Sequence, residues 1–307
     1  MHGGTWSAPI ELTDLHPCGV QHVVGRLHHR ELGGAHRPAQ ISAGEVPRLS
    51  RSGSAYPRAV QMAHAQRMID AREVLCDACN QMTFEGAGVA AVYNPIDYAR
   101  PMADAYLRRY VDGPRRVLMF GMNPGPWGMA QNGVPFGEVA AVRDFLKLDA
   151  PIGRPERWGG EHPKRPVVGM DCTRSEVSGR RVWALLKDRY GTADAALSDL
   201  HVLNFCPLVF MGETGKNITP DRLTAAERAP LEAACRAHLV RVLEILEPEH
   251  VVGVGVWAEK QAAAVVEAAG SPAKVSRILH PSPASPLSNK DWPGTVTRQL
   301  IEAGVWH

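Results

Sequence analysis

Short apolar runs that alternate with longer amphipathic segments are the main pattern of this chain. The runs are typical of buried strands and lie at 117–121, 201–206, 250–256 and 275–280. Apolar residues at helical spacing fill the intervals and the C-terminal end, over 138–147, 178–190, 224–246, 257–269 and 293–303. Alternating strands and helices predict βαβ units. We therefore expect one α/β domain over residues 61–307, a three-layer α/β/α fold with a central, mostly parallel sheet.

Residues 1–60 differ from the rest of the chain. They show no apolar periodicity, Gly, Pro and Ser interrupt them throughout, and they hold six of the 13 histidines. Such a segment buries too little apolar surface to fold, so we expect a disordered N-terminal extension, or sequence upstream of the native start. A histidine-rich metal-binding tail is the alternative, although its spacings do not resemble a closed metal site.

Bulk composition narrows the class of protein. The chain has 307 residues, is 45% hydrophobic, and balances 34 basic against 32 acidic side chains. This near-neutral charge argues against a polyelectrolyte binder of nucleic acid, but is compatible with a DNA enzyme that has a local basic face. Six cysteines without disulfide spacing, no signal pattern and no apolar run of transmembrane length predict an intracellular protein, cytoplasmic or nuclear, that does not contact membranes.

The strand ends carry the candidate chemistry. In open α/β sheets, ligands bind beyond the carboxyl ends of the strands. The predicted strands run into Gly121–Gly125, Asn204–Leu208, Gly253–Trp257 and His280–Pro283. The first of these loops continues to residue 139 with many Gly and Pro residues, which is typical of a stiff pocket wall, and no Gly-Lys-Ser/Thr follows as in a Walker A loop.

Two asparagines, a histidine and a phenylalanine should meet at this edge. An Asn amide has one donor and one acceptor and pairs with an imide edge, whereas Phe136 offers a stacking surface. His280 would donate a hydrogen bond to an oxygen that gains charge. No carboxylate cluster, Ser/His/Asp set or Cys/His set accompanies them. The combination indicates a site that reads a flat, neutral heterocycle.

Several ordered motifs carry a family resemblance over roughly residues 80–307. They are Tyr93–Pro95, Gly121–Val139, His162–Pro166, Ser175–Gly179, Asn204–Phe210, Asn217–Pro220, Val251–Gly255 and His280–Pro283. With these motifs the sequence resembles the single-strand-selective monofunctional uracil-DNA glycosylases, a branch of the uracil-DNA glycosylase superfamily. The resemblance implies hydrolysis of the bond between uracil and deoxyribose in single- and double-stranded DNA, the first step of base-excision repair.

The resemblance also implies residue roles. Asn123 would position the attacking water, and His280 would stabilise the departing uracil anion. Phe136 would stack on the flipped base, and the amide of Asn204 would read its edge. Backbone groups at two further positions would line the pocket, namely Met122 and Gly125. No motif lysine is placed to form a Schiff base, which fits a monofunctional enzyme, and we expect no metal or cofactor and a monomer.

The loop after His280 implies DNA contacts and one departure from the family. The family commonly has an arginine wedge where this chain has Ala284, and Leu287 would partly fill the gap. The expected DNA-contacting residues are Pro283, Ala284, Leu287 and Lys290. Gly125 and its small neighbours leave room at uracil C5, so we expect C5-oxidised uracils such as 5-hydroxymethyluracil as substrates, with thymine rejected.

Three alternatives accompany this hypothesis. Cys76 and Cys79 form a C-x-x-C pair that could belong to an iron–sulfur cluster, although no second pair matches it. Gly253–Ala258 fits G-x-G-x-x-A of a dinucleotide-binding fold, but no acid follows at the ribose-binding distance. The third is an inactive nucleic-acid-binding module.

A basic face that contacts DNA phosphates is also expected. It would draw on Arg115, Arg116, Lys164, Arg165, Arg174, Arg180 and Arg181.

Overall fold

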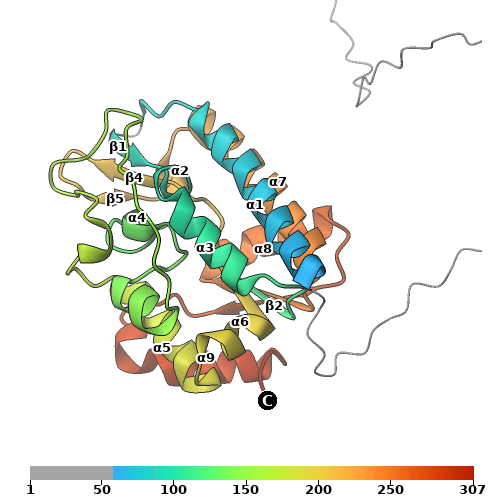
Figure 1. Cartoon of the computed structure of the whole chain (residues 1–307). Helices are drawn as coiled ribbons and strands as arrows, with labels where there is room; N and C mark the ends of the chain where they lie inside the picture. The colour runs from blue at the N-terminus through green and yellow to red at the C-terminus, as the bar shows by residue number, and fades with distance from the viewer. Residues whose placement is uncertain (1–57, 87) are drawn as a thin grey trace, which may run out of the picture. The chain divides into compact units, whose positions relative to one another are not determined.

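A parallel four-stranded sheet forms the centre of the computed structural model, which describes residues 58–86 and 88–307 (Figure 1). In sheet order the strands are β3 (Leu200–Asn204), β2 (Val117–Gly121), β6 (His250–Val254) and β7 (Lys274–Ile278). Every residue of β2, β3 and β6 is buried, in agreement with the predominance of apolar residues in these strands. These four strands and their parallel order confirm the predicted fold class.

The register of the sheet brings the strand ends to one edge. Gly121 at the end of β2 pairs with Asn204 at the end of β3, and Val254 of β6 pairs with Ile278 of β7. Asn123 and His280 each follow their strand by two residues. The residues that the sequence singled out therefore emerge from neighbouring strands on the same edge.

A second, antiparallel sheet was not predicted from the sequence. It contains β1 (Val89–Tyr93), β4 (Val209–Gly212) and β5 (Asn217–Ile218), in the order β1-β4-β5. Two of these strands, β4 and β5, have only four and two residues, too few for a clear periodic pattern. β4 leaves the end of β3 after four residues, so this small sheet lies next to the carboxyl edge of the parallel sheet.

Helices flank the parallel sheet, with α1 and α7 in contact along their lengths (Figure 1). The α-helices are α1 (Arg58–Asn80), α2 (Pro95–Tyr98), α3 (Arg100–Tyr110), α4 (Met129–Asn132), α5 (Val177–Tyr190), α6 (Ala193–Asp199), α7 (Ala225–Leu246), α8 (Val256–Ala268) and α9 (Ser288–Glu302). The helix expected over 138–147 is present over 139–145, with π geometry over Ala141–Phe145. Thr224 and Glu227 form the capping box that starts α7.

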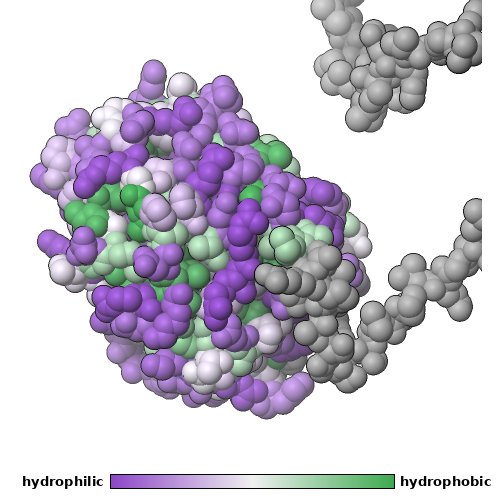
Figure 2. Space-filling model, in the orientation of Figure 1, coloured by the Kyte–Doolittle hydropathy of each residue, from purple (hydrophilic) through white to green (hydrophobic). Residues whose placement is uncertain are grey.

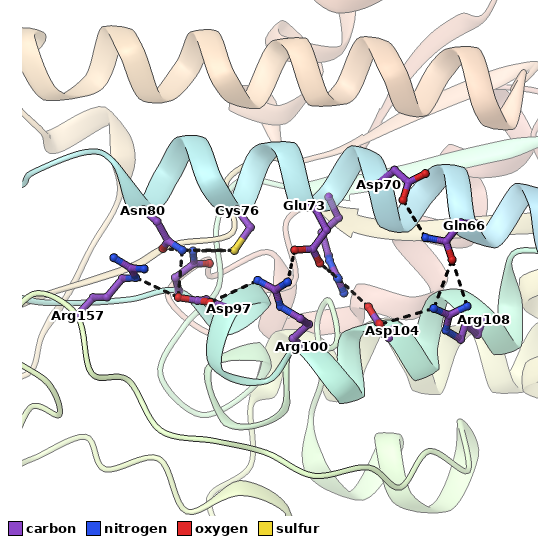
Figure 3. Close-up of polar contacts among 12 residues, drawn as sticks. Gln66, Asp70, Glu73, Cys76, Asn80, Asp97, Arg100, Asp104, Arg108 and Arg157 are labelled. Carbon is purple, nitrogen blue, oxygen red and sulfur yellow. Dashed lines mark hydrogen bonds and ion pairs between the residues drawn. The ribbon is translucent and has the colours of Figure 1, made fainter.

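A line of polar contacts joins α1 to the α2–α3 segment (Figure 3). Arg72 and Arg100 both pair with Glu73, and Arg72 also reaches Asp104 at 2.6 Å. At the other end, the Asn94 amide donates to Asn80 Oδ1 at 2.9 Å. Asn94 belongs to the Tyr-Asn-Pro motif, and its contacts anchor the start of α2 to α1.

Apolar side chains gather in one main core around the parallel sheet. The face shown in Figure 2 is mostly hydrophilic, with apolar residues in small separate patches. Among the described helices, none is both long and apolar enough to cross a bilayer. Residues 1–57 lie outside the described residues, so the extension over 1–60 and its histidine-rich alternative stay predictions.

Candidate active site

A cavity of about 270 Å³ opens at the carboxyl edge of the parallel sheet. It is lined by all six predicted pocket residues, Met122, Asn123, Gly125, Phe136, Asn204 and His280. The sheet register explains this convergence, because the four segments that supply them leave adjacent strand ends or return to them. The remaining lining residues are Gly121, Pro124, Met129, Glu176, Ser178, Asn217, Thr219 and Ser282.

Phe136 forms one wall of the cavity in an unusual backbone conformation. Its φ of 52° lies in the left-handed region, which is uncommon for a residue with a side chain. The Trp183 indole donates to the Phe136 carbonyl at 3.0 Å, and a Cβ on Gly179 would overlap the same oxygen. The start of α5 therefore holds the peptide of Phe136 in place. Such local strain is typical of functional sites.

Asn204 presents an amide that is only weakly engaged. Its side chain is buried, and its Nδ2 donates to the Met129 sulfur at 3.2 Å. A thioether is a poor acceptor, so a ligand carbonyl would be a better partner for this N–H group. Asn204 also lies beside Gly121 and Phe136, where an added Cβ on Gly121 would meet both side chains.

Asn123 has a fixed orientation with a free acceptor. Its Nδ2 donates to the carbonyls of Leu208 at 3.2 Å and Pro124 at 3.4 Å. No donor among the described residues contacts its Oδ1. The amide therefore directs one acceptor toward the cavity, where it suits a hydrogen bond from a water molecule.

His280 is held as a neutral donor. The backbone N–H of Ser282 donates to Nδ1 at 3.1 Å, so we assign the proton to Nε2. Burial lowers the pKa of His280 below its ordinary 6.5, which keeps the ring uncharged near neutral pH. Gly255 packs against this ring at a φ of 94°, and a Cβ there would lie 3.3 Å from the imidazole. The second glycine of the G-x-G pattern therefore makes room for His280.

Glu176 is the cavity residue of most chemical interest that sequence reasoning missed. Its carboxylate caps α5, accepting from Ser178 N at 3.1 Å and Gly179 N at 2.5 Å. Burial raises its pKa above the ordinary value, and the backbone hydrogen bonds oppose this rise. Glu176 lies within the Ser-Glu-Val-Ser-Gly motif, so the signal was present in the sequence, but no role was assigned to it.

Two buried amides fix the loop between β2 and α5. Gln131 donates to the carbonyls of Pro126 at 2.9 Å and Pro166 at 3.0 Å, and accepts from Val168 N. Asn132 donates to Gly137 O at 2.6 Å. The Gly- and Pro-rich loop is therefore cross-linked to its surroundings, in agreement with the stiff pocket wall expected from the sequence.

The predicted DNA-contacting residues lie outside the cavity. They are Pro283, Ala284, Leu287 and Lys290, and all four are exposed. Leu287 is 63% exposed and is one of the large hydrophobic residues on the surface of the described chain. Arg181 holds this loop by donating to Pro281 O at 2.7 Å and to Asn289 Oδ1 at 3.0 Å. Arg181, a member of the predicted basic face, is therefore used in contacts within the protein.

Two other members of that basic face are used within the fold. Arg115 is buried and bonds to Asp112 and to three backbone carbonyls, those of Tyr110, Gly113 and Pro114. Arg116 forms a two-bond ion pair with Asp199 at 2.7 Å. These contacts engage both guanidinium groups within the fold, so the expectation that they face phosphates is not supported by their positions.

Arg165 and Arg174 have a different environment. Their guanidinium carbons lie 5.2 and 5.1 Å from the ring centre of Trp127, and no described acidic residue pairs with either. We call these three residues the Trp127 cluster. Trp127 belongs to the same loop as Asn123 and Gly125, so the cluster adds two uncompensated positive charges near the cavity.

The cysteine pair lies in the core, away from the cavity. Cys76 and Cys79 are fully buried in α1, and burial raises the pKa of Cys76 to about 11 and that of Cys79 further. They are therefore protonated thiols at neutral pH. Within the described part of the chain, no group of three or more His, Cys, Asp or Glu residues is arranged to hold a metal ion.

Gly253 has a packing role. A Cβ there would collide with the backbone of Glu259 at the start of α8. Close contact between strand and helix therefore explains this glycine without dinucleotide binding.

Comparison with known proteins gives a consistent result. A family model described as the uracil DNA glycosylase superfamily matches residues 109–298. The single-strand selective monofunctional uracil DNA glycosylase of Bos taurus is 43% identical over 231 residues, 75% of this chain and 84% of its own. The Mus musculus protein of the same description is 43% identical over 217 residues, 71% of this chain and 77% of its own.

A solved structure shares the fold. The crystal structure of wild-type Pedobacter heparinus SMUG2 aligns with a TM-score of 0.56 at 16% identity, covering 79% of this chain and 97% of that one. At this identity the likeness concerns the fold alone.

The state of His280 is directly testable. We expect nitrogen NMR at pH 7 to show a neutral ring with the proton on Nε2, and a titration midpoint below 6.5. The pKa of His280 is then higher in the unfolded state than in the folded state, so the unfolded state takes up a proton at a higher pH. Protonation should therefore lower the free energy of unfolding as the pH falls below 6.5. A His280→Gln variant assigns the signal, and a midpoint at or above 6.5 would contradict the assignment.

Proposed function

The chain belongs to the single-strand selective monofunctional uracil-DNA glycosylases within the uracil DNA glycosylase superfamily, and we propose that it removes uracil and C5-oxidised uracils from single- and double-stranded DNA. It is thus a hydrolase that acts on N-glycosyl bonds in base-excision repair. One observation carries the catalytic part of the proposal: a neutral His280 with a free Nε2–H shares a cavity with the oriented Asn123.

His280 would stabilise the leaving group. When the bond between C1′ of the sugar and N1 of uracil breaks, its electron pair leaves with the base and charge develops on the uracil oxygens. The Nε2–H group can donate to one of these oxygens without a change of tautomer, because Nδ1 already accepts from Ser282. Preorganised donors of this kind contribute roughly 3 kcal/mol to transition-state stabilisation.

Asn123 would orient the nucleophile and leave the proton transfer to solvent. Its amide cannot act as a base at neutral pH, so the water attacks a sugar that already carries positive charge. The water oxygen bonds to C1′, and its proton passes to bulk water. The hydrogen bond from Asn123 to Leu208 O keeps Oδ1 in the acceptor position. Asn123 would therefore contribute by positioning the water molecule and not by transferring a proton.

Phe136 and Asn204 would bind the base once it is flipped out of the stack. The ring of Phe136 supplies a stacking face, and the Asn204 amide matches the alternating donors and acceptors of the uracil imide edge. The Asn204 amide would exchange its weak hydrogen bond to the Met129 sulfur for a stronger one to a uracil carbonyl, which favours this pairing. All of these groups come from one chain, so the proposal requires only a monomer.

Gly125 supports the acceptance of C5 substituents. It lines the cavity, and a Cβ added to it would meet nothing within 4 Å. The open space suits a hydroxymethyl group, which replaces the hydrogen bonds of a displaced water molecule. A methyl group cannot replace them, which gives a physical reason to reject thymine.

DNA contacts outside the cavity would come from the Trp127 cluster and the loop after His280. Two guanidinium groups without acidic partners can bind phosphates, and Trp127 can stack on a base. Leu287, exposed at the start of α9, is placed on this loop as a wedge for duplex DNA. Pro283, Ala284 and Lys290 complete this proposed contact surface.

The catalytic assignments are tested by single-turnover cleavage of a uracil-containing oligonucleotide, followed by alkali treatment of the abasic site. We expect Asn123→Ala and His280→Leu each to slow excision about a hundredfold or more, because each removes one transition-state contact. Ser198→Ala, which alters an exposed hydroxyl on α6, is a matched control. A wild-type rate in Asn123→Ala, or absence of excision by the wild type, would overturn the proposal.

The base preference is tested at Gly125. Wild-type protein should excise uracil and 5-hydroxymethyluracil and leave thymine intact. Gly125→Tyr should slow 5-hydroxymethyluracil excision at least tenfold more than uracil excision, because the new ring fills the space beside C5. Gly125→Ala controls for the backbone effect. Equal losses on both bases would contradict this account of the cavity.

The wedge is tested at Leu287. Leu287→Ala should slow excision from duplex DNA several-fold while leaving single-stranded DNA unaffected, because only a stacked and paired base must be displaced. Ile301→Ala, at another exposed apolar residue of α9, serves as the control. Equal slowing on both substrates would remove Leu287 from this role.

A further inference from the structure

Glu176 is the one ionisable acidic side chain among the residues that line the described cavity. The other polar lining residues are neutral amides, hydroxyls and the neutral imidazole of His280. The cavity therefore places a single carboxyl group beside the proposed reaction centre.

The local structure fixes this carboxyl group tightly. Ser178 N and Gly179 N donate to its two oxygens, and Gly128 approaches so closely that a Cβ there would lie 2.9 Å from Glu176 Cγ. Gly128 belongs to the loop that carries Asn123, so Glu176 connects this loop to α5. Its position is set by backbone on two sides.

Capping alone does not account for a carboxylate at this position. The caps of α6 and α7 are hydroxyl groups of Thr192 and Thr224, which accept the same kind of N–H bond without a charge in the cap side chain. Burial of an ionised carboxyl group is costly, and here it raises the pKa of Glu176. A half-buried charge in the wall of a ligand cavity is more readily explained by a positive charge that arises in that cavity.

We propose that the Glu176 carboxylate stabilises the positive charge on the deoxyribose as the N-glycosyl bond breaks. This inference rests on the proposed function. When the electron pair leaves with uracil N1, C1′ and the ring oxygen of the sugar share a positive charge, and the negative carboxylate lowers its energy. Glu176 remains ionised throughout and forms no bond. Water then supplies the oxygen at C1′ and releases its proton to solvent.

This role separates binding from catalysis. DNA is a polyanion, so a buried negative charge at the cavity weakens binding of the intact substrate. The same charge favours the transition state, in which the sugar is cationic. Removal of the charge should therefore slow the chemical step without weakening DNA binding, whereas damage to a structural cap would lower stability and binding together.

The experiment compares Glu176→Gln with Glu176→Asp in the full chain. Glutamine keeps an oxygen for the cap and loses the charge, whereas aspartate keeps the charge on a shorter side chain. Single-turnover excision is measured on single-stranded uracil DNA, and affinity on an oligonucleotide with a non-cleavable 2′-fluoro analogue of deoxyuridine. Glu227→Gln is the matched control, because Glu227 also accepts backbone N–H groups at a helix start but does not line the cavity.

We expect Glu176→Gln to slow excision at least tenfold, with affinity for the analogue unchanged or tighter, and Glu176→Asp to retain more activity than Glu176→Gln. Thermal unfolding of each variant gives the activity per folded molecule. The inference is overturned if Glu176→Gln excises uracil within twofold of the wild type, if affinity falls by the same factor as the rate, or if the rates follow only the melting temperatures. A wild-type protein that excises uracil upholds the proposed function in each of these cases.

Discussion

The close approach of the Phe136 ring to Gly121 is the constraint on which the cavity depends. A Cβ on Gly121 would lie 2.6 Å from Phe136 Cζ, so only glycine at the end of β2 lets the ring reach this position. Asn204 pairs in register with Gly121 and therefore lies beside the same ring. The positive φ of Phe136 turns its side chain toward this strand end, and α5 holds its carbonyl group. The absence of a side chain at Gly121 thus allows the Phe136 ring and the Asn204 amide to lie side by side.

Neutrality is the second physical feature of the site. His280 and the two asparagines offer polarity without a net charge, which limits the cost of burying them in a cavity. The backbone sets the orientation of Asn123 and His280, through Leu208 O and Ser282 N, whereas Asn204 donates to the Met129 sulfur. A charge is therefore present only at Glu176, where two backbone N–H groups partly offset the cost of burial.

Much of this arrangement could be predicted from the sequence, for identifiable reasons. The four strands of the parallel sheet follow short runs rich in apolar residues, and the rule that ligands bind at strand ends was enough to bring Asn123, Asn204 and His280 together. The antiparallel sheet was missed because two of its three strands, β4 and β5, have only four and two residues and leave no periodic pattern. Arg115 was misjudged because charge pairing depends on tertiary neighbours, which the sequence does not show. Glu176 was overlooked because its importance comes from its place in the cavity wall, which depends on the tertiary fold.

Because the cavity is preformed, the free-energy cost of recognition arises mainly from the conformational change of the DNA. The loop that carries Asn123 is cross-linked through Gln131, and the segment after His280 is held by Arg181. Groups that are already oriented lose little free energy when charge develops, which is the basis of electrostatic catalysis. A rigid cavity cannot follow a base that remains stacked, so the nucleotide itself must leave the helix. The free energy of unstacking then becomes part of selectivity, because a mispaired or single-stranded uracil requires less of it than a base in a matched pair.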